Sequence, residues 1–379
     1  MIDRIKTNTI QNWLYKNKVV MIMGARQVGK TTICKDLLKN NLPSVYLNCE
    51  RIQVKELLES KNIEQIRSFL GDNKLVVFDE AQKIKDIGLV LKLIHDTYPE
   101  IQIIASGSSS FELSNELNEP LTGRNIKFQI SPISINELIN HFGKMWMNDN
   151  LESLLRFGSY PDIVLRHESE KMMLLDEIAT DYLYRDVLMM DSVKNSDLLI
   201  KLLKALALQL GNQVSYNELA NLLKTSVETI QKYIRLLEHS FVIFKLGTFS
   251  RNLRSELAIS QKYYFYDLGV RNSLLQNYLP MSNRTDVGAL WENFCVIERM
   301  KILSEKDTKA NHYFWRTYQQ QEIDLVEERN GKLLAFEFKY SENAKVKAPK
   351  LFLETYKEGA FVVVNKSNFL DTLLKVDLV

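Results

Sequence analysis

Short runs of apolar residues alternate with helical patterns over the first 145 residues of the chain. Each run is about as long as a strand and is rich in apolar residues, which is typical of strands buried on both faces of a sheet. Strands that alternate with helices predict a doubly wound parallel sheet. The predicted strands are 19–23, 43–48, 74–78, 101–106 and 125–130, and the predicted helices between them include 32–38 and 51–70.

The middle of the chain changes from a mixed pattern to a helical one. Residues 150–195 have apolar positions spaced for helices with one buried face, interrupted by a turn at 158–161. Three further helices and two strands then predict a winged helix-turn-helix. These helices are 198–210, 216–223 and 227–238, and the strands are 241–246 and 262–266.

The last part of the chain has the pattern of a small α/β domain. A helix at 291–298 precedes strands at 321–326, 333–340 and 359–364. The whole pattern therefore predicts an α/β fold class with four parts. They are an α/β core at 1–145, a helical lid or linker at 146–195, a winged helix-turn-helix at 196–283 and a small α/β domain at 284–379.

Composition narrows the class of protein without deciding its function. The chain has 379 residues and a formal net charge of +2, so a basic surface for nucleic acid would have to be local. Its three cysteines are too few and too scattered for a disulfide framework or a zinc site. The beginning of the chain lacks the apolar core of a signal peptide, and no apolar run approaches the length of a membrane span. We therefore expect a cytoplasmic protein that does not contact membranes.

The first apolar run leads into a phosphate-binding pattern. Residues 24–31 read Gly-Ala-Arg-Gln-Val-Gly-Lys-Thr and fit G-x-x-x-x-G-K-[ST] between a strand and a helix, the Walker A motif. Glycines let backbone N–H groups turn inward around phosphate oxygens, and the next helix adds the positive end of its dipole. Lys30 is expected to reach the β- and γ-phosphates, and the Thr31 hydroxyl is expected to ligate Mg²⁺. The pattern predicts a P-loop site for ATP or ADP with Mg²⁺. The expected nucleotide contacts are Gly24, Ala25, Arg26, Gln27, Val28, Gly29, Lys30, Thr31 and Thr32.

Further candidate residues follow the later strands. The third strand ends in Asp79 and Glu80, a Walker B arrangement, in which Asp79 would hold Mg²⁺ through water and Glu80 would orient or deprotonate the attacking water. After the fourth strand, either Ser106 or Ser108 would contact the γ-phosphate or the lytic water, and the sequence does not choose between them. Arg124, next to a glycine and directly before the strand 125–130, would insert into the γ-phosphate site in cis or from a neighbouring subunit. The alternative is a solvent-exposed charge at the edge of that strand.

These motifs together resemble a known family. The chain is similar to the bacterial and archaeal AAA+ ATPases that have an AAA-14 type core and a C-terminal domain of unknown function, the DUF 4143 group. The resemblance covers nearly the whole chain and implies an ATPase core, a winged-helix segment and a nuclease-like C-terminal fold. It rests on the motifs at 24–31, 77–82, 106–109, 121–124 and 131–138, and it continues at 158–161 and 182–186.

The C-terminal strands contain a second candidate site. Glu337 and Lys339 share one face of a strand because side chains alternate. The arrangement resembles the PD-(D/E)xK nuclease fold, which implies that Glu292, Asp324 and Glu337 bind a metal ion. Lys339 would then position or activate the water that attacks a phosphodiester. The chain departs from the named pattern at Ile323, where that pattern has proline.

The third helix of the winged-helix segment is a candidate for nucleic-acid binding. Its apolar stripe leaves Thr229, Lys232 and Arg235 facing outward, and Arg251 and Arg254 lie in the loop between the two strands. This pattern predicts DNA binding, with the helix in a groove and the wing on phosphates. The alternative is a winged-helix scaffold that contacts protein.

The sequence therefore predicts an ATPase that couples ATP hydrolysis to DNA binding or processing. The alternative is a nucleotide-dependent protein switch or scaffold whose nuclease-like domain is inactive. A motor function would require an oligomer, which the sequence does not establish.

Overall fold

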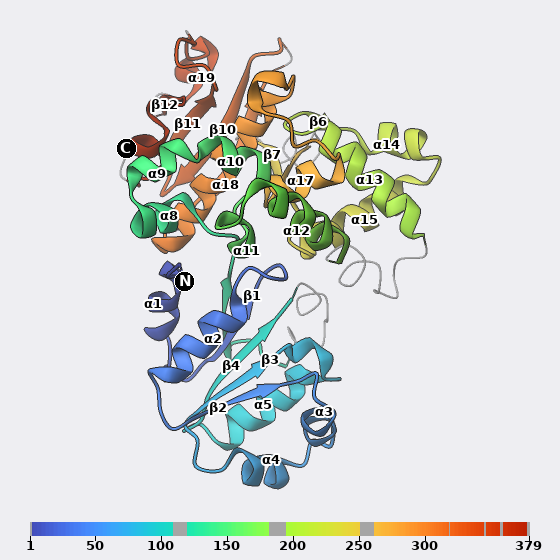
Figure 1. Ribbon diagram of the computed structural model, residues 1–379, viewed down its shortest axis with the longest axis vertical. Coiled ribbons are helices and arrows are strands. Elements are labelled where there is room, and N and C mark those ends of the chain that lie inside the picture. Colours follow the sequence, from blue (N-terminus) through green and yellow to red (C-terminus); the bar gives the residue numbers. More distant parts are fainter. Residues whose placement is uncertain are drawn as a thin grey trace. The chain divides into compact units, whose positions relative to one another are not determined.

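The chain folds into two compact units, each with one β-sheet (Figure 1). The first unit is built mainly from residues up to Ile133 and the second mainly from the residues after it. The first unit is therefore shorter than the predicted domain 1–145. The structure is a computed structural model that describes residues 2–108, 120–181, 195–250, 261–317, 319–344, 346–356 and 359–376.

The sheet of the first unit is parallel. It consists of β1 (Val19–Met23), β2 (Ser44–Asn48), β3 (Leu75–Asp79), β4 (Gln102–Gly107) and β5 (Asn125–Gln129). The strand order is β2-β3-β4-β1-β5, and all neighbouring strands run parallel. β1, β3 and β4 are buried along their whole length, which explains why their sequences are apolar runs rather than alternating patterns. The predicted α/β fold with a parallel sheet is confirmed.

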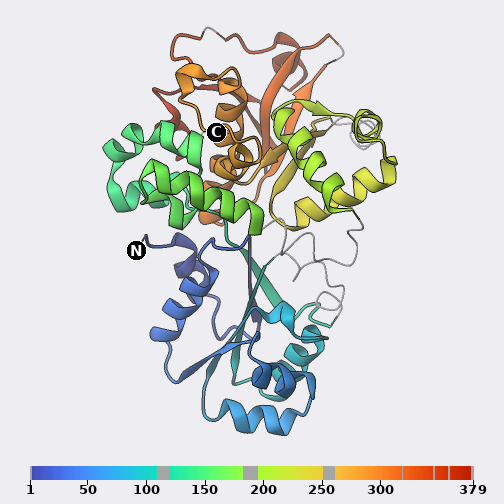
Figure 2. The same ribbon diagram turned by 45° about the vertical axis from the view of Figure 1, so that its right-hand side comes forward.

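One helix precedes β1, and further helices lie between the strands. They are α1 (Ile5–Gln11), α2 (Lys30–Lys39), α3 (Ile52–Glu59), α4 (Ile63–Leu70), the 3₁₀ turn η1 (Ala81–Lys83) and α5 (Ile87–Thr97). In Figure 2 the dark blue α1 and α2 lie on one side of the sheet and the cyan α5 lies on the other. The predicted helix 51–70 is two helices, because Lys61 has a φ of 55° and Asn62 caps α4 by accepting from the Gln65 N–H.

Helices make up the first half of the second unit. They are α8 (Ile135–Phe142), α9 (Lys144–Asp149), α10 (Leu151–Phe157), α11 (Pro161–Val164), α12 (Glu168–Asp181), α13 (Ser196–Leu208), α14 (Tyr216–Leu223) and α15 (Val227–His239). The last three closely match the predicted helices of the winged-helix segment. The start of α8 is fixed by a capping box, in which Ser134 and Glu137 each accept a hydrogen bond from the other's backbone N–H.

One sheet runs through the rest of the second unit. Its strands are β6 (Gln213–Val214), β7 (Ile243–Thr248), β8 (Gln261–Phe265), β9 (Asn311–Arg316), β10 (Glu322–Arg329), β11 (Lys332–Phe338) and β12 (Ala360–Val364). The order is β12-β11-β10-β9-β7-β8-β6. The remaining helical elements are α17 (Leu268–Leu274), η3 (Met281–Asn283), α18 (Val287–Glu305), α19 (Lys350–Thr355) and α20 (Phe369–Leu373).

This sheet continues across the predicted boundary at residue 283. β7 pairs with β8 in antiparallel fashion and with β9 in parallel, through Gly247 opposite Tyr313 and Thr248 opposite Phe314. The segments 196–283 and 284–379 therefore share a sheet rather than forming separate cores.

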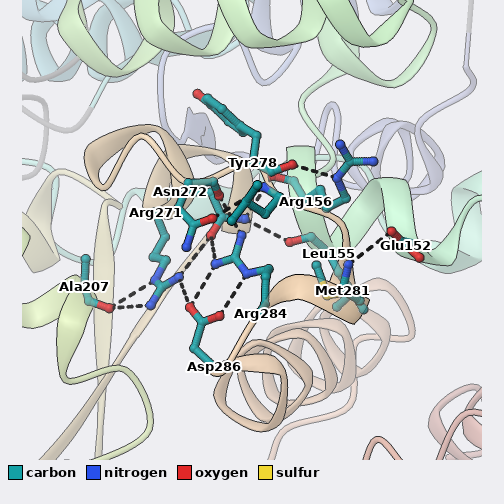
Figure 3. A network of polar contacts seen from close by, with 12 residues as sticks. Glu152, Leu155, Arg156, Ala207, Arg271, Asn272, Tyr278, Met281, Arg284 and Asp286 are labelled. Atoms are coloured by element: carbon teal, nitrogen blue, oxygen red, sulfur yellow. Dashed lines mark hydrogen bonds and ion pairs between the residues drawn. The ribbon is translucent and has the colours of Figure 1, made fainter.

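A network of buried polar side chains joins α10, α13 and α17 (Figure 3). Arg271 Nε and Nη2 donate to Ala207 O at 3.0 and 2.8 Å, and Asn272 Nδ2 donates to Leu155 O at 3.0 Å. These carbonyls belong to the last turns of α13 and α10, where intrahelical partners run out. Asp286 compensates the buried charge by accepting from Arg271 Nη1 at 2.6 Å and from Arg284 Nε at 2.8 Å. The network therefore closes the ends of two helices and fixes them to α17.

We predict that Asp286→Asn lowers the free energy of unfolding by roughly 3 kcal/mol, because it leaves two buried guanidinium groups without a carboxylate. Asp371→Asn is the matched control, since the Lys144–Asp371 pair is exposed and is worth less than about 1 kcal/mol. Urea unfolding of both variants measures the difference. Equal losses in the two variants would contradict this role of the network.

The same aspartate predicts a pH dependence. Burial alone would raise the pKa of Asp286, but hydrogen bonds from Arg284 and Arg271 lower it to about 2. A depressed carboxyl pKa contributes stability above the unfolded-state value of about 3.9, and this contribution disappears as the pH falls toward 2. The stability difference between the wild type and Asp286→Asn is therefore expected to shrink over that interval in acid-unfolding experiments.

Candidate functional site

The loop between β1 and α2 is shaped by two glycines. Gly24 has a φ of 153°, and a Cβ atom at that position would lie 2.2 Å from the Ile130 carbonyl oxygen. Gly29 has a φ of 99° and is the N-cap of α2. Because both positions exclude an ordinary side chain, the backbone can turn its N–H groups inward at the beginning of a helix. This is the geometry that the sequence predicts for a phosphate-binding loop.

Lys30 lies inside this loop. Its side chain is buried, and Nζ donates hydrogen bonds to Gly24 O at 2.9 Å and to Ala25 O at 2.7 Å. These bonds hold the ammonium group beside the loop amides, where it can attract the oxygens of a phosphate. The predicted nucleotide contacts at residues 24–32 lie in this loop and in the first turn of α2.

Asp79 is the centre of the polar contacts at the end of β3. Its carboxylate accepts from the Thr31 hydroxyl at 2.8 Å and from the Glu80 backbone N–H at 3.2 Å. The hydroxyl groups of Tyr46 and Ser106 donate to it as well. Burial alone would raise the pKa of Asp79, but the hydrogen bonds from the three hydroxyls outweigh it and lower that pKa below its ordinary value. Asp79 is therefore ionised at neutral pH.

Glu80 and Ser108 are connected by a glutamine. Gln82 Nε2 donates to a Glu80 carboxylate oxygen and to Ser108 Oγ, the latter at 3.2 Å. Glu80 has a φ of 54°, which turns the chain directly after β3. The two candidate serines thus occupy different places: Ser106 contacts Asp79, whereas Ser108 belongs to the group around Glu80.

Two residues of this site were missed by the sequence analysis. Tyr46 is in β2, which pairs directly with β3, so the strand order brings its hydroxyl to Asp79. Gln82 follows Glu80 within the 3₁₀ turn η1. Gln82 could have been found from its place in the sequence Asp-Glu-Ala-Gln, which follows the third predicted strand. No local pattern indicated Tyr46.

Arg124 does not lie with these residues. It precedes β5, which runs parallel to β1, and its carbonyl accepts from the N–H of Val19 at the beginning of β1. The phosphate loop follows the C-terminal end of β1, so Arg124 lies at the opposite end of the parallel strands. There its Nε pairs with Asp96 at 2.7 Å. The proposed cis contact with a γ-phosphate does not fit this position. A role in trans remains a prediction.

The residues around Asp79 fit a magnesium ion held together with nucleotide phosphates. Mg²⁺ takes hard oxygen ligands and usually keeps several waters, with one or two protein ligands completing its shell. The Thr31 hydroxyl donates its proton to an ionised Asp79, so its oxygen lone pairs can face a cation. Thr31 could thus be a direct ligand, and Asp79 could hold a water of the ion.

The predicted C-terminal residues also come together, in what we call the carboxylate cluster: Glu292, Glu322, Asp324 and Glu337 with Lys262 and Lys339. Lys339 Nζ lies 2.6 Å from Glu337 Oε1 and 4.0 Å from Asp324 Oδ2, and the Phe338 N–H donates to Asp324 Oδ2 at 2.8 Å. Glu292 reaches the same region from α18 and interacts electrostatically with Asp324. The four residues Glu292, Asp324, Glu337 and Lys339 therefore lie close together.

A lysine that the sequence analysis missed occupies this cluster. Lys262 of β8 places Nζ 3.0 Å from Glu292 Oε1 and 2.6 Å from Glu322 Oε1. Burial alone would lower the pKa of Lys262, but the two glutamates raise it above its ordinary value, so the ammonium stays charged. Across the described part of the chain, no three His, Cys, Asp or Glu side chains are arranged to hold a metal ion. The predicted metal ion at Glu292, Asp324 and Glu337 does not fit this arrangement, because the buried ammonium group of Lys262 already pairs with Glu292.

The outer face of α15 carries the predicted basic residues. Ile230, Ile234 and Leu237 are buried, while Lys232 and Arg235 are exposed and Thr229 is partly buried. Arg251, Arg254 and the motif at 182–186 lie outside the described residues. No helix in the parts of the chain that are described is long and apolar enough to cross a bilayer.

The parallel sheet and the Lys30–Thr31–Asp79 arrangement define a P-loop protein of the Walker type. Comparison with protein-family models makes this more specific, because an AAA domain (AAA_14) matches residues 16–139. Two domains of unknown function follow, DUF8612 at residues 148–280 and DUF4143 at residues 287–376. The chain is thus an AAA-type protein with a C-terminal DUF4143 domain, which confirms the family resemblance.

Known relatives extend over most of the chain. An uncharacterized protein of Methanocaldococcus jannaschii is 26% identical, and the match covers 94% of this chain and 82% of that protein. An uncharacterized protein of Mycobacterium tuberculosis is also 26% identical, with 86% of this chain and 71% of that protein covered. Among solved structures, a Walker-type ATPase of Pyrococcus abyssi has a TM-score of 0.53 at 15% identity, over 73% of this chain and 96% of that chain. The likeness to that structure concerns the fold alone.

We predict that Gly24→Ala destabilises the first unit by roughly 3 kcal/mol or more, because the new Cβ would collide with the Ile130 backbone oxygen. Gly123→Ala is the control. Gly123 has a φ of 74° but open space around it, so only the backbone cost of roughly 1–2 kcal/mol applies. Hydrogen exchange of the β1 and β3 amides measures the loss of stability in both variants. Similar losses in Gly24→Ala and Gly123→Ala would show that the close approach of Gly24 to Ile130 is unimportant.

Proposed function

We propose that this protein hydrolyses ATP with Mg²⁺ and couples the nucleotide to DNA binding through residues 196–283. The observation that carries the ATPase part is the hydrogen bond from Thr31 to Asp79 beside the buried Lys30. It joins the phosphate loop to the acidic end of β3, which is the combination that phosphoryl transfer from a nucleotide requires.

Each residue of the site has a role in this proposal. The loop amides and Lys30 Nζ would bind the β- and γ-phosphates, and Thr31 and Asp79 would hold Mg²⁺ directly and through water. Bound Mg²⁺ supplies positive charge that neutralises the phosphate oxygens. Glu80 would take the proton of the attacking water. Ser108 would contact the γ-phosphate or that water, and Gln82 would hold Ser108 and Glu80 in place by hydrogen bonds to both.

We predict that Lys30→Ala loses ATP binding, whereas Glu80→Gln still binds ATP but turns it over roughly 10²- to 10⁴-fold more slowly. The difference arises because Lys30 binds phosphate in the ground state, while Glu80 acts only on the attacking water. Nucleotide binding and phosphate release measure the two effects separately. Lys55→Ala, which changes an exposed lysine of α3, is the control. Turnover that survives in Lys30→Ala would refute the ATPase proposal.

Two features support DNA binding by the winged-helix segment. The order α13, β6, α14, α15, β7, β8, with β8 between β6 and β7, is the connectivity expected of a winged helix. Lys232 and Arg235 then lie on the exposed face of α15, the helix that would enter a groove. Exposed cations at this place can contact phosphates and release bound counterions.

We predict that Lys232→Ala and Arg235→Ala each weaken DNA binding and reduce the slope of log affinity against log salt by about one. Fluorescence anisotropy with double- and single-stranded DNA over a range of salt concentrations measures this slope. Lys55→Ala is again the control, since it removes the same charge elsewhere. If both α15 variants keep the wild-type slope, DNA is not bound by this helix.

A second function is favoured by the buried Lys262. The proximity of Glu292, Asp324, Glu337 and Lys339 supports a nuclease-like α/β fold for residues 284–379, but the lysine-compensated carboxylates favour an inactive one. The protein would then be a nucleotide-dependent switch or scaffold whose partner is another protein. ATP turnover with and without DNA separates the two functions, because stimulation by DNA is expected only for the DNA-coupled ATPase.

A further inference from the structure

The carboxylate cluster is covered by the winged-helix segment on two sides. Lys262 and Tyr264 both point from β8 to the same oxygen, Glu292 Oε1, at 3.0 and 2.6 Å. They do so because residues two apart share one face of a strand. The turn after α13 approaches the other oxygen, since a Cβ atom at Gly211 would lie 3.2 Å from Glu292 Oε2. Glu292 is therefore enclosed by residues that precede the C-terminal domain in sequence.

Lys262 is held in the cluster by more than one contact. Its side chain is 1% exposed, and its Nζ lies 2.6 Å from Glu322 Oε1 and 5.4 Å from the centre of the Phe314 ring. A buried ammonium group is stable only if carboxylates and hydrogen bonds replace its hydration. Both glutamates are supplied by α18 and β10, so β8 is tied to these two elements by charge as well as by the sheet.

The charges in the cluster nearly balance without a metal ion. The third cation is Arg316, whose Nη1 lies 3.0 Å from Glu322 Oε2. The four carboxylates are Glu292, Glu322, Asp324 and Glu337, and the three cations are Lys262, Lys339 and Arg316.

We infer that Lys262 is an internal counter-ion that takes the place of a divalent cation in the carboxylate cluster and closes the cluster to metal. A divalent ion in this cluster would need carboxylate oxygens that are free to point at it. Here Glu292 Oε1 already accepts from Lys262 and Tyr264, and Glu337 Oε1 is paired with Lys339 at 2.6 Å. The inference is independent of the proposed ATP hydrolysis, because it concerns only residues of the second unit.

The test is to remove the Lys262 charge in the full-length protein while keeping most of its stem, with Lys262→Met. The variant is expected to be less stable than the wild type, and Mn²⁺ is expected to restore part of that stability. At a hundredfold excess of Mn²⁺ over its dissociation constant, the melting temperature should rise by roughly 5 °C. The Mn²⁺ electron paramagnetic resonance signal, recorded without nucleotide, measures binding directly.

Matched variants locate the effect. Lys262→Arg keeps the positive charge and should show no gain in Mn²⁺ binding, whereas adding Asp324→Asn to Lys262→Met should abolish the gain. If Lys262→Met folds and does not gain Mn²⁺ binding, Lys262 is not what closes the cluster and the inference is wrong.

A second comparison tests whether the carboxylate cluster is closed to metal in the wild type, even if Lys262→Met does not fold. The wild type and Asp324→Asn are expected to bind Mn²⁺ equally, since any site at the phosphate loop is the same in both proteins. Equal binding supports the inference. A Mn²⁺ site that is present in the wild type and lost in Asp324→Asn would overturn it.

Discussion

The first unit depends on one carboxylate, that of Asp79, which gathers hydrogen bonds from three different elements. Thr31 belongs to the phosphate-loop helix α2, Tyr46 to β2 and Ser106 to β4. These residues can meet because the strands are parallel, so their carboxyl ends lie at one edge of the sheet. The same contacts keep Asp79 ionised. The hydrogen bonds to Asp79 thus link the order of the strands, the position of the phosphate loop and the negative charge that is available to a metal ion.

In the second unit, buried cations rather than a buried carboxylate are the centres of the polar contacts. Arg271 and Arg284 share Asp286 and satisfy the carbonyl ends of helices, while Lys262 lies between Glu292 and Glu322. Lys262 and its two glutamates come from two strands and a helix, whereas Arg271, Arg284 and Asp286 lie within one short stretch of the chain. Removing one member would leave a buried charge without a partner, which costs more than the pair contributes relative to apolar packing. We conclude that these charges specify which helices and strands pack together, more than they add to total stability.

The sequence predicted the parts of the fold whose environment is uniform along an element. β1, β3 and β4 are buried on both faces, and the stripe of Ile230, Ile234 and Leu237 faces the core, so apolar periodicity was sufficient. β9 was not predicted, because its sequence Asn-His-Tyr-Phe-Trp-Arg mixes polar and aromatic residues and pairs with both β7 and β10. The motifs indicated Lys30, Thr31 and Asp79, but Arg124 was misplaced because the sequence does not show that the strand after it lies beside β1 and parallel to it. Lys262 was missed because a lone lysine in a strand gives no sign of the carboxylates that three-dimensional packing brings to it.

The continuity of the second sheet limits how this unit can respond to a nucleotide. β7 is bonded to β8 on one edge and to β9 on the other, and β8 carries Lys262 into the carboxylate cluster. Moving β8 away from α18 and β10 would break sheet hydrogen bonds and leave an ammonium group buried without its two glutamates. β7, β8, α18 and the C-terminal strands are therefore tied together by sheet hydrogen bonds and charge pairs. A change of nucleotide state that reaches this unit would therefore act on β8 and the carboxylate cluster together.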